Sequence, residues 1–457
     1  MQHLLEADQK SIGKQMWQFS WPTIVAMLCS ALYNIIDRAF VGRGVGSLAI
    51  AATTVAFPIM MILFSVSLLI GIGATALISI RLGEQKKEEA EVIAGNATLW
   101  LIVFPLIISV LYLAFPRPIL ILFGASPEVL PYARDFMQII MLGSVFGSLS
   151  FGMNNFIRAE GSPIMAMSTQ VLGALINGIL NYIFIFKLGL GIKGSALATV
   201  AGQIFSAFWI LAYYWTGRSH IRLRLKNMLP QSAIFFSIIA IGFAPFVLEL
   251  ANCFQQALLN KTVAAYSGDL ALSAVGILIS VLTLILMLII GISQGAQPLI
   301  GFNYGARNYD RVKAVLTRGI IAASVVSMAG YLAIQIWPTP IVGIFSGRNT
   351  ELTGLTSHAM VVFFGMLFII GFQVMGSQYF QAVGKAPQAA VLTLSRQVLL
   401  FIPLLLILPH FWGIEGVWRT APIADGLSCL LTAGFIIYEV KHMPDTQPLA
   451  TGALEQV

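Results

Sequence analysis

Charged residues are scarce in this sequence. They make up 10% of its 457 residues, whereas a soluble domain contains roughly 25%. Hydrophobic residues account for 58%, and the mean hydropathy is +0.86. This balance excludes a soluble globular protein and predicts an all-α integral membrane protein. Because a membrane-spanning helix and its connection use roughly 30 to 40 residues, the length allows on the order of a dozen spans.

Cysteine is also rare. The three cysteines, Cys29, Cys253 and Cys429, lie in apolar runs and form no spaced pair, which argues against a disulfide framework and a zinc site. The stretch GFNYGARNYDRV (301–312) lacks the pattern of a phosphate-binding P-loop, so ATP is not expected to drive this protein. We therefore expect neither an enzyme nor a bound cofactor. A cleavable signal peptide is not expected, because residues 1–13 are polar and lead straight into a full span.

Long apolar runs dominate the rest of the chain and predict twelve membrane-spanning helices. The predicted segments are 15–40, 47–78, 91–114, 132–158, 164–187, 192–215, 232–260, 269–297, 316–338, 355–383, 388–410 and 415–440. Proline removes a backbone donor, so Pro22, Pro58, Pro245 and Pro298 are the expected places for bends or helix ends.

The distribution of basic residues predicts the orientation. If the N-terminus is cytoplasmic, sixteen of the 26 Lys and Arg residues fall on the cytoplasmic side, nine on the other, and one inside a span. This bias follows the positive-inside rule, so both termini, including the tail 441–457, are expected to be cytoplasmic. The net charge of +7 then needs no nucleic-acid partner and fits contact with anionic lipid. We expect a multi-pass protein of a bacterial inner membrane.

The chain contains an internal repeat. At an offset near 223 the first half matches the second at four places: FSWP (19–22) with GFAP (242–245), GSLAIAA (46–52) with GDLALSA (268–274), RAEGSP (158–163) with AVGKAP (382–387), and GIKGSA (191–196) with GIEGVW (413–418). Each half has six predicted helices, so the halves share one orientation. This predicts two pseudo-symmetric lobes, 1–222 and 223–440, joined by the basic loop 218–230 and enclosing a cavity that opens to either side in turn.

An acidic residue lies within the first predicted span, PTIVAMLCSALYNIIDRAFV (22–41). An unpaired charge in the hydrocarbon is costly, so Asp37 must face protein or water, take a proton, or hold a cation. We interpret Asp37 as the coupling residue of a transporter, with Tyr33 one turn before it. The alternative is a carboxylate near the interface that is neutralised by Arg38 or Arg43.

Further polar residues of the first half favour a site around Asp37. Asn177 and Asn181 are four residues apart in the fifth predicted helix and so share a face, and Thr199 lies in the sixth. If these helices meet, one carboxylate, two amides and a hydroxyl form an oxygen-rich cluster suited to a proton or to a monovalent cation such as Na⁺. The alternative is that the asparagines only bridge helices by hydrogen bonds.

The second half has its own polar candidates inside predicted spans. They are Glu249, Asn260, Arg396 and Asp425. At the repeat offset Asp37 lies over Asn260, so only the first half keeps the titratable group at this position. Two acids and one base leave net negative charge, which would attract a lipophilic cation. We expect one structural pair with Arg396 and one spare carboxylate, Glu249.

At these residues the chain resembles the multidrug and toxic compound extrusion (MATE) transporters, and within them the bacterial MepA-like branch. The resemblance rests on four stretches from both halves: YNIIDRAFVGRGVG (33–46), AIAATTVAFP (49–58), NNFIRAEGSP (154–163) and GISQGAQPLIGFNYGARNYDRV (291–312). It implies a twelve-helix antiporter that exchanges an inward flow of protons or sodium ions for outward movement of amphipathic, often cationic, drugs.

The resemblance also implies roles for single residues. The aspartate of helix 1 in the proton-coupled DinF-like relatives matches Asp37, and their helix 1 proline is most nearly matched by Pro22. Their helix 5 asparagine and helix 6 threonine match Asn177 and Thr199. This chain departs from them at Asn181, where they carry a second aspartate. Asp37 is therefore expected to carry the protonation chemistry alone.

We thus expect a monomeric, proton-coupled efflux antiporter for small amphipathic compounds, with sodium coupling still open. Two alternatives remain. A lipid-linked oligosaccharide flippase of the same superfamily would need a cationic cavity for its pyrophosphate substrate, and Arg396 is the one deeply placed base. A membrane scaffold would give no reason for acidic residues inside spans.

Overall fold

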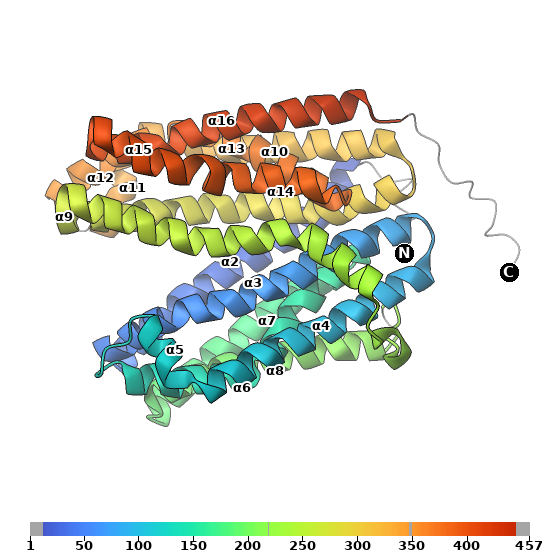
Figure 1. The fold of residues 1–457 in the computed structure, drawn as a ribbon, viewed down its shortest axis with the longest axis horizontal. Helices are drawn as coiled ribbons and strands as arrows, with labels where there is room; N and C mark the ends of the chain where they lie inside the picture. The colour runs from blue at the N-terminus through green and yellow to red at the C-terminus, as the bar shows by residue number, and fades with distance from the viewer. Residues whose placement is uncertain (1–11, 218, 347–349, 445–457) are drawn as a thin grey trace, which may run out of the picture. The chain divides into compact units, whose positions relative to one another are not determined.

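The computed structural model describes residues 12–217, 219–346 and 350–444, with side chains everywhere in these ranges except at 33–35, 38, 39, 47, 264, 265, 267–269, 272 and 346. Within these ranges the regular structure is entirely helical and contains no strand (Figure 1). In hydrocarbon a single apolar segment can satisfy its backbone hydrogen bonds only as a helix. The predicted all-α class is confirmed.

The first half of the chain forms the six predicted helices and three short ones. These elements are α2 (Ile12–Gly44), α3 (Ser47–Gly83), α4 (Lys87–Ala114), α5 (Pro116–Leu122), α6 (Leu130–Ala159), α7 (Pro163–Tyr182), the π-helix η2 (Ile183–Lys187), α8 (Gly191–Trp215) and the 3-10 helix η3 (Leu225–Met228). The sequence did not predict α5, a single apolar helix of seven residues that is too short to cross a membrane.

The second half begins with α9 (Ser232–Gly305), which holds two apolar spans, Ser232–Val263 and Ser273–Gly305. The later elements are α10 (Tyr309–Ile336), α11 (Pro338–Ser346), α12 (Thr350–Phe363), the 3-10 helix η4 (Leu367–Ile369), α13 (Ile370–Ala382), α14 (Ala386–Leu394), the π-helix η5 (Ser395–Phe401), α15 (Ile402–Trp412) and α16 (Ile414–Lys441).

These helices account for all twelve predicted spans. In the described residues, ten helical stretches are long and apolar enough to cross a membrane, and α12 with α13 forms an eleventh that is bent by 46°. The 33-residue helix α2 occupies the first predicted segment. The protein is therefore a multi-span membrane protein with the predicted twelve-helix architecture.

A break between two helices of one span lies away from the four prolines. Pro22 and Pro58 lie inside α2 and α3, and Pro245 and Pro298 lie inside α9, so none of the four ends a helix. The 46° bend instead separates α12 from α13, where the backbone N–H of Gly365 bonds to the carbonyl of Val362 in a tighter turn. No proline lies at this bend, and it was not predicted from the sequence.

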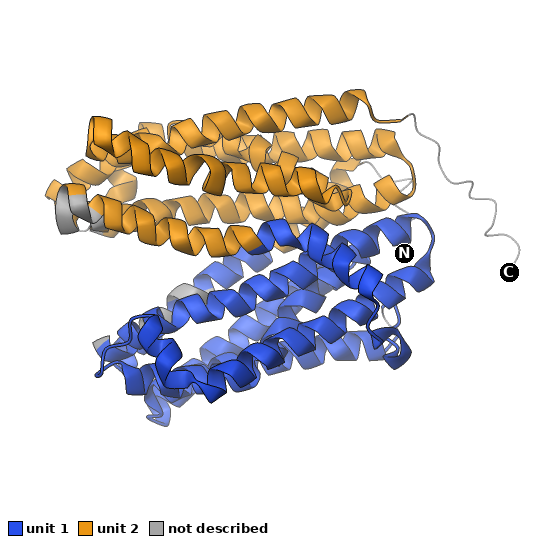
Figure 2. Cartoon of the chain, in the orientation of Figure 1, with its two compact units in different colours: residues 1–9, 25–246 blue, residues 10–24, 247–457 orange. Residues whose placement is uncertain are grey.

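The helices form two compact units. Among the described residues, unit 1 holds Val25–Phe246, and unit 2 holds the chain up to Ile24 and from Val247 onward (Figure 2). The start of α2 thus belongs with the second half of the chain, and the start of α9 belongs with the first half. The lobes 1–222 and 223–440 remain a prediction of the repeat.

Glycines allow close packing of these two segments, the start of α2 and the start of α9, against the unit that each one joins. In unit 1, a Cβ on Gly242 of α9 would lie 1.8 Å from the carbonyl oxygen of Leu69 on α3. In unit 2, a Cβ on Gly295 of α9 would lie 2.7 Å from the Cα of Ser20 on α2. Both contacts require a residue without a side chain, because backbone meets backbone there. The two contacts join corresponding pairs of helices in the repeat, although the glycine lies on the first helix of one pair and on the second helix of the other.

Candidate functional site

Asp37 of α2 is held by side chains from two other helices of unit 1. Asn181, near the end of α7, donates from Nδ2 to Asp37 Oδ1 at 2.5 Å. Ser195, in the first turns of α8, donates its hydroxyl to the same oxygen at 3.2 Å. Both donors are fully buried, so the carboxylate reaches from α2 into the interior of unit 1. Its position does not fit a carboxylate that faces only the interface.

A second layer of amide and hydroxyl groups continues from Asn181. The Nδ2 atom of Asn181 also lies 3.2 Å from Asn177 Oδ1, and Asn177 donates from Nδ2 to Thr199 Oγ1 at 3.2 Å. The carboxylate, the two amides and the threonine therefore form one continuous hydrogen-bonded chain. The structure brings together these four predicted site residues, and their role in coupling remains a prediction.

Ser195 belongs to this cluster and was missed from the sequence. It precedes Thr199 by four residues on α8, so the two hydroxyls share a face of that helix. The spacing alone could have identified it once Thr199 was a candidate. A lone serine next to a glycine, as in GIKGSA (191–196), otherwise gives no signal of its own, because small residues are common where membrane helices pack.

One acceptor in the cluster has no partner. The Oδ1 atom of Asn181 is buried and accepts no hydrogen bond from the described residues. A buried acceptor left unpaired costs roughly 1–3 kcal/mol, so such atoms usually mark a water, an ion or a functional site. This oxygen belongs to the same amide whose nitrogen holds Asp37. The cluster therefore has one acceptor available for a proton donor or a cation.

A cavity of about 160 Å³ adjoins the cluster. Asn177 and Thr199 line it, together with the hydroxyl and amide side chains Ser30, Ser150, Thr169, Gln170, Gln203 and Ser206. The Oε1 atoms of Gln170 and Gln203 are buried and lack partners among the described residues. Since a water molecule needs several polar partners and modest space, these hydroxyl and amide groups suit bound water on their side of the cavity. Among the residues whose side chains the structure describes, neither lysine nor arginine lines it.

Backbone irregularity accompanies both polar regions. The π-helix Ile183–Lys187 begins two residues after Asn181, and the π-helix Ser395–Phe401 contains Arg396. π-Helical turns insert an extra residue and occur frequently at functional sites. In both cases the altered turn lies next to a predicted site residue, which changes the direction of the side chains that follow it.

The remaining candidates of the first half have different outcomes. Pro22 lies inside α2, two residues before this helix passes from unit 2 to unit 1. The side chains of Tyr33 and Arg38 lie outside the described residues. Arg43 is exposed and forms no ion pair with a described carboxylate. Arg43 therefore does not neutralise Asp37 in this structure.

The candidates of the second half form one pair. Arg396 donates from Nε to Asp425 Oδ1 at 2.7 Å, and both side chains are largely buried. Asn260 accepts a bond of 3.0 Å from Gln256 on its own helix, and Glu249 is half-buried on α9. The structure thus pairs Arg396 with Asp425. It places neither Glu249 nor Asn260 in that ion pair.

A further buried carboxylate lies just beyond α6. Glu160 Oε2 accepts hydrogen bonds from the Ser219 hydroxyl at 2.6 Å and from the backbone N–H groups of His220 at 2.9 Å and Ile221 at 3.3 Å. Burial raises the pKa of Glu160 to about 7, although these bonds act in the opposite direction. Glu160 belongs to the stretch RAEGSP (158–163) of the internal repeat, and the sequence predicts no role for it.

Comparisons with known proteins agree with the fold and the repeat. The MatE family model matches residues 22–183 and 245–407, two segments that begin 223 residues apart, as the repeat predicts. The Multidrug export protein MepA of Staphylococcus haemolyticus (strain JCSC1435) is 27% identical over 441 residues, 96% of each chain.

Two solved structures share the fold at 22% identity, each with a TM-score of 0.90. The outward-facing conformation of a multidrug resistance MATE family transporter of the MOP superfamily matches over 97% of this chain and 98% of that one. A MATE structure in the bent conformation matches over 97% of both chains. The predicted resemblance to MATE proteins of the MepA-like branch is confirmed, and the chain belongs to the MatE family.

Proposed function

We propose that this protein exports several small amphipathic compounds, many of them cationic, from a bacterial cell in exchange for protons. The observation that carries the proposal is the position of Asp37, which reaches from α2 into unit 1 and is held there by Asn181 and Ser195. The similarity to the multidrug export protein MepA over 96% of both chains supports drugs as the substrate class.

The hydrogen bonds suggest how a proton acts. Asn181 and Ser195 both donate to Asp37, and a charged acceptor makes such bonds roughly twice as strong as a neutral one. Protonation of Asp37 therefore weakens the attachment of α2 to α7 and α8. The proton that is gained also needs an acceptor. Asn181 Oδ1 has no partner among the described residues, and rotation of the Asn181 amide would turn this oxygen toward the protonated Asp37.

In the proposed cycle, the outward-open state takes up a proton at Asp37 and α2 repacks, with Pro22 as its bending point. The drug is then released, and the carrier returns to the inward-open state. Protonation biases an equilibrium between two states only by its differential affinity for them. The change in hydrogen bonding at Asp37 provides that difference.

Sodium is the second candidate for the coupling ion. Asp37, Asn177, Asn181 and Thr199 all offer oxygen atoms, which hard cations prefer. We favour the proton because a single carboxylate is sufficient for it, whereas the nitrogen of Asn181, and not its oxygen, faces Asp37. We further propose a monomer in the cytoplasmic membrane, with both termini cytoplasmic and no cofactor other than the coupling ion.

Oligosaccharide flipping has less support. A pyrophosphate substrate would require several basic side chains in the cavity. The described side chains that line the cavity beside Asn177 and Thr199 include none, and Arg396 is already paired with Asp425.

The test is uptake of a fluorescent cationic dye into everted membrane vesicles, driven separately by a pH gradient and by a sodium gradient. We expect the pH gradient to drive uptake by the parent, and Asp37→Asn to lower the initial rate at least about tenfold, because a proton site has been removed. Asp135→Asn, at an exposed carboxylate paired with Lys193, is the matched control. Uptake by Asp37→Asn at the parental rate would falsify the proposal.

A further inference from the structure

The loop that joins the two halves of the chain is attached firmly to α4. The backbone N–H of Arg222 donates to Glu91 Oε1 at 3.0 Å. Asn96 of α4 also holds a later part of the loop through two hydrogen bonds. Its side chain donates to the carbonyl of Asn227 at 3.1 Å and accepts from the backbone N–H of Gln231 at 2.8 Å. A Cβ on Gly95 would lie 2.5 Å from the Asn227 oxygen. The loop is therefore held in a defined shape against unit 1.

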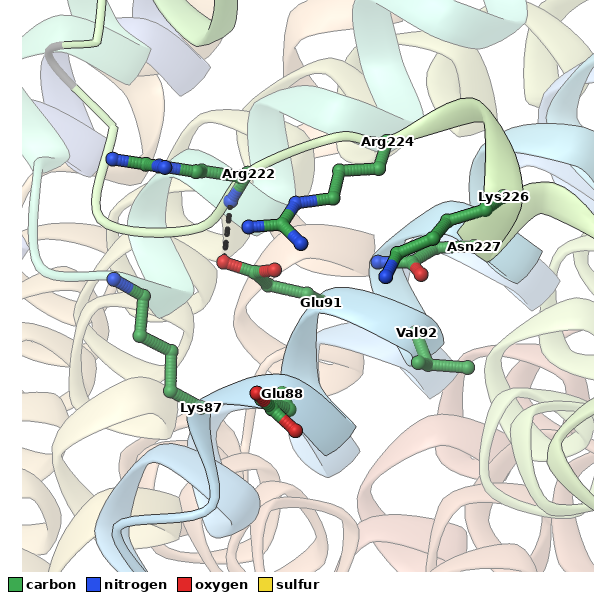
Figure 3. A pocket seen from close by; sticks show the side chains of 8 residues that line it. All are labelled: Lys87, Glu88, Glu91, Val92, Arg222, Arg224, Lys226 and Asn227. Atoms are coloured by element: carbon green, nitrogen blue, oxygen red, sulfur yellow. Dashed lines mark hydrogen bonds between the residues drawn. The ribbon is translucent and has the colours of Figure 1, made fainter.

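This attachment creates a pocket of about 320 Å³ between the loop and the start of α4 (Figure 3). Four bases line it: Lys87 from α4, and Arg222, Arg224 and Lys226 from the loop. Two carboxylates, Glu88 and Glu91, also line it, and Glu91 is already bonded to the loop backbone. The lining carries a net positive charge, so the pocket attracts an anion.

The charged side-chain groups of these four bases are not paired with a carboxylate that the structure describes. In the ranges that the structure describes, none of them forms an ion pair within 4.0 Å. In contrast, two bases of the connection between α3 and α4, Arg81 and Lys86, are paired with Glu84. The positive-inside rule explains why bases gather on this side. It does not explain why four of them line one preformed pocket and remain unpaired.

Exposed apolar side chains lie between and beside these bases. Leu225, between Arg224 and Lys226, is 84% exposed, and Leu229 is 68% exposed. Trp215, at the end of α8, is 82% exposed. Leucine and tryptophan at the end of a membrane span are suited to the boundary between headgroups and acyl chains. A soluble anion would not account for these apolar residues, whereas a lipid contacts both kinds of side chain.

We propose that this pocket binds the phosphate of an anionic phospholipid headgroup from the cytoplasmic leaflet, with Leu225 and Leu229 against its acyl chains. Arginine pairs with phosphate oxygens through two parallel hydrogen bonds, and lysine adds a point charge. Basic pockets on the cytoplasmic side of membrane helices bind such headgroups. The bound lipid anchors the loop between the two halves of the chain to the membrane surface.

Native mass spectrometry of the full-length protein tests this. The protein in detergent is titrated with phosphatidylglycerol and with phosphatidylethanolamine. We expect the parent to favour phosphatidylglycerol, and Arg224→Gln with Lys226→Gln to weaken its binding roughly 30-fold, since each base near an anionic surface contributes about fivefold. The control is Lys14→Gln with Lys441→Gln, two exposed bases outside the pocket. Equal binding by both double variants overturns the proposal.

A second comparison separates lipid from free phosphate. Thermal stability is measured with short-chain phosphatidylglycerol and with inorganic phosphate, for the parent and for Leu225→Gln with Leu229→Gln. We expect stabilisation by the lipid, a smaller effect in the leucine variant, and no comparable effect of phosphate. Equal stabilisation by inorganic phosphate, unchanged in the leucine variant, overturns the lipid assignment. Neither readout depends on transport, so a failed transport test leaves this proposal unaffected.

Discussion

The side-chain amide of Asn181 lies 2.5 Å from Asp37 although 144 residues separate them in the chain. The same nitrogen also contacts Asn177, so this one side chain links the carboxylate of α2 to the amide and hydroxyl groups behind it. Asn181 itself is fully buried. Its geometry makes it the central residue of the cluster, whereas the sequence predicted it only as one of two amides that share a face of the fifth helix.

Replacing Asn181 by Ala tests this central position. The substitution removes the donor to Asp37 and leaves the Asn177 oxygen without its partner. Hydrogen bonds to charged groups contribute roughly 1.5–3 kcal/mol, so we expect the initial rate of proton-driven dye uptake to fall about tenfold or more. Everted vesicles with equal amounts of inserted protein provide the measurement.

Ile179→Ala is the control for Asn181→Ala, because Ile179 lies on the same helix and is exposed. We expect uptake by this variant to stay within about twofold of the parent, as surface substitutions usually have small effects. If both variants transport at the parental rate, Asn181 does not support Asp37.

The buried pair Arg396–Asp425 should respond asymmetrically to substitution. Removing one partner leaves an uncompensated buried charge, which costs roughly 3–5 kcal/mol, whereas replacing both by apolar residues is often neutral. We expect Arg396→Met and Asp425→Leu each to lower the thermal midpoint of the purified protein in detergent, and the double variant to recover most of the loss.

The exposed pair Lys193–Asp135, at 3.3 Å, is the control for this pair, because exposed ion pairs contribute at most about 1 kcal/mol. Asp135→Leu should change the midpoint little. Equal destabilisation by the double variant and the single variants would show that Arg396 and Asp425 do not act as a pair.

Glu160 predicts a pH dependence of stability. Its pKa is about 7 in the folded protein, above the ordinary value of about 4.3 that applies to the unfolded chain. A raised pKa means that the folded state favours the protonated form. This contribution is therefore fully present below about pH 4 and is lost as the pH rises through about 7. Thermal midpoints measured from pH 5 to pH 8 should fall with rising pH.

Glu160→Gln should remove this part of the profile, since an uncharged amide resembles the protonated acid and still accepts the bonds from Ser219 and His220. Glu128→Gln, at an exposed glutamate, should retain the parental slope. A Glu160→Gln profile with the parental slope would place the titrating group elsewhere.

The features predicted from the sequence are those with a local or periodic signal. The length of the apolar runs predicts the spans, and four matches near one offset predict the repeat. The close contacts at Gly242 and Gly295 join corresponding pairs of helices of this repeat. An isolated acid in an apolar run identifies Asp37. The burial of Glu160 has no such signal, and Ser195 has only its spacing to Thr199, because the contacts of both depend on which distant segment packs against them.

The attachment of the connecting loop to α4 was also not predicted from the sequence. Its bases and its Pro230 indicate a solvated connection between lobes, whereas Asn96 on α4 fixes it by hydrogen bonds to its backbone. Backbone contacts carry no residue signature, so only the neighbouring Gly95, with no space for a Cβ, reflects them in the sequence. The bend near Gly365 was not predicted either, because glycines are frequent in membrane helices and a single glycine therefore does not indicate a bend.

Gly242→Ala tests the packing of the exchanged start of α9. A Cβ there would lie 1.8 Å from the carbonyl oxygen of Leu69, so α9 must move away from α3. A Cβ on Gly276, also in α9, would have no neighbouring atom of the described residues within 4 Å. Gly276→Ala should therefore stabilise the protein by about 0.5–1 kcal/mol through helix propensity. The two identical chemical changes therefore predict opposite shifts of the thermal midpoint in detergent. Shifts of the same sign and size would mean that α9 does not contact α3 at this glycine.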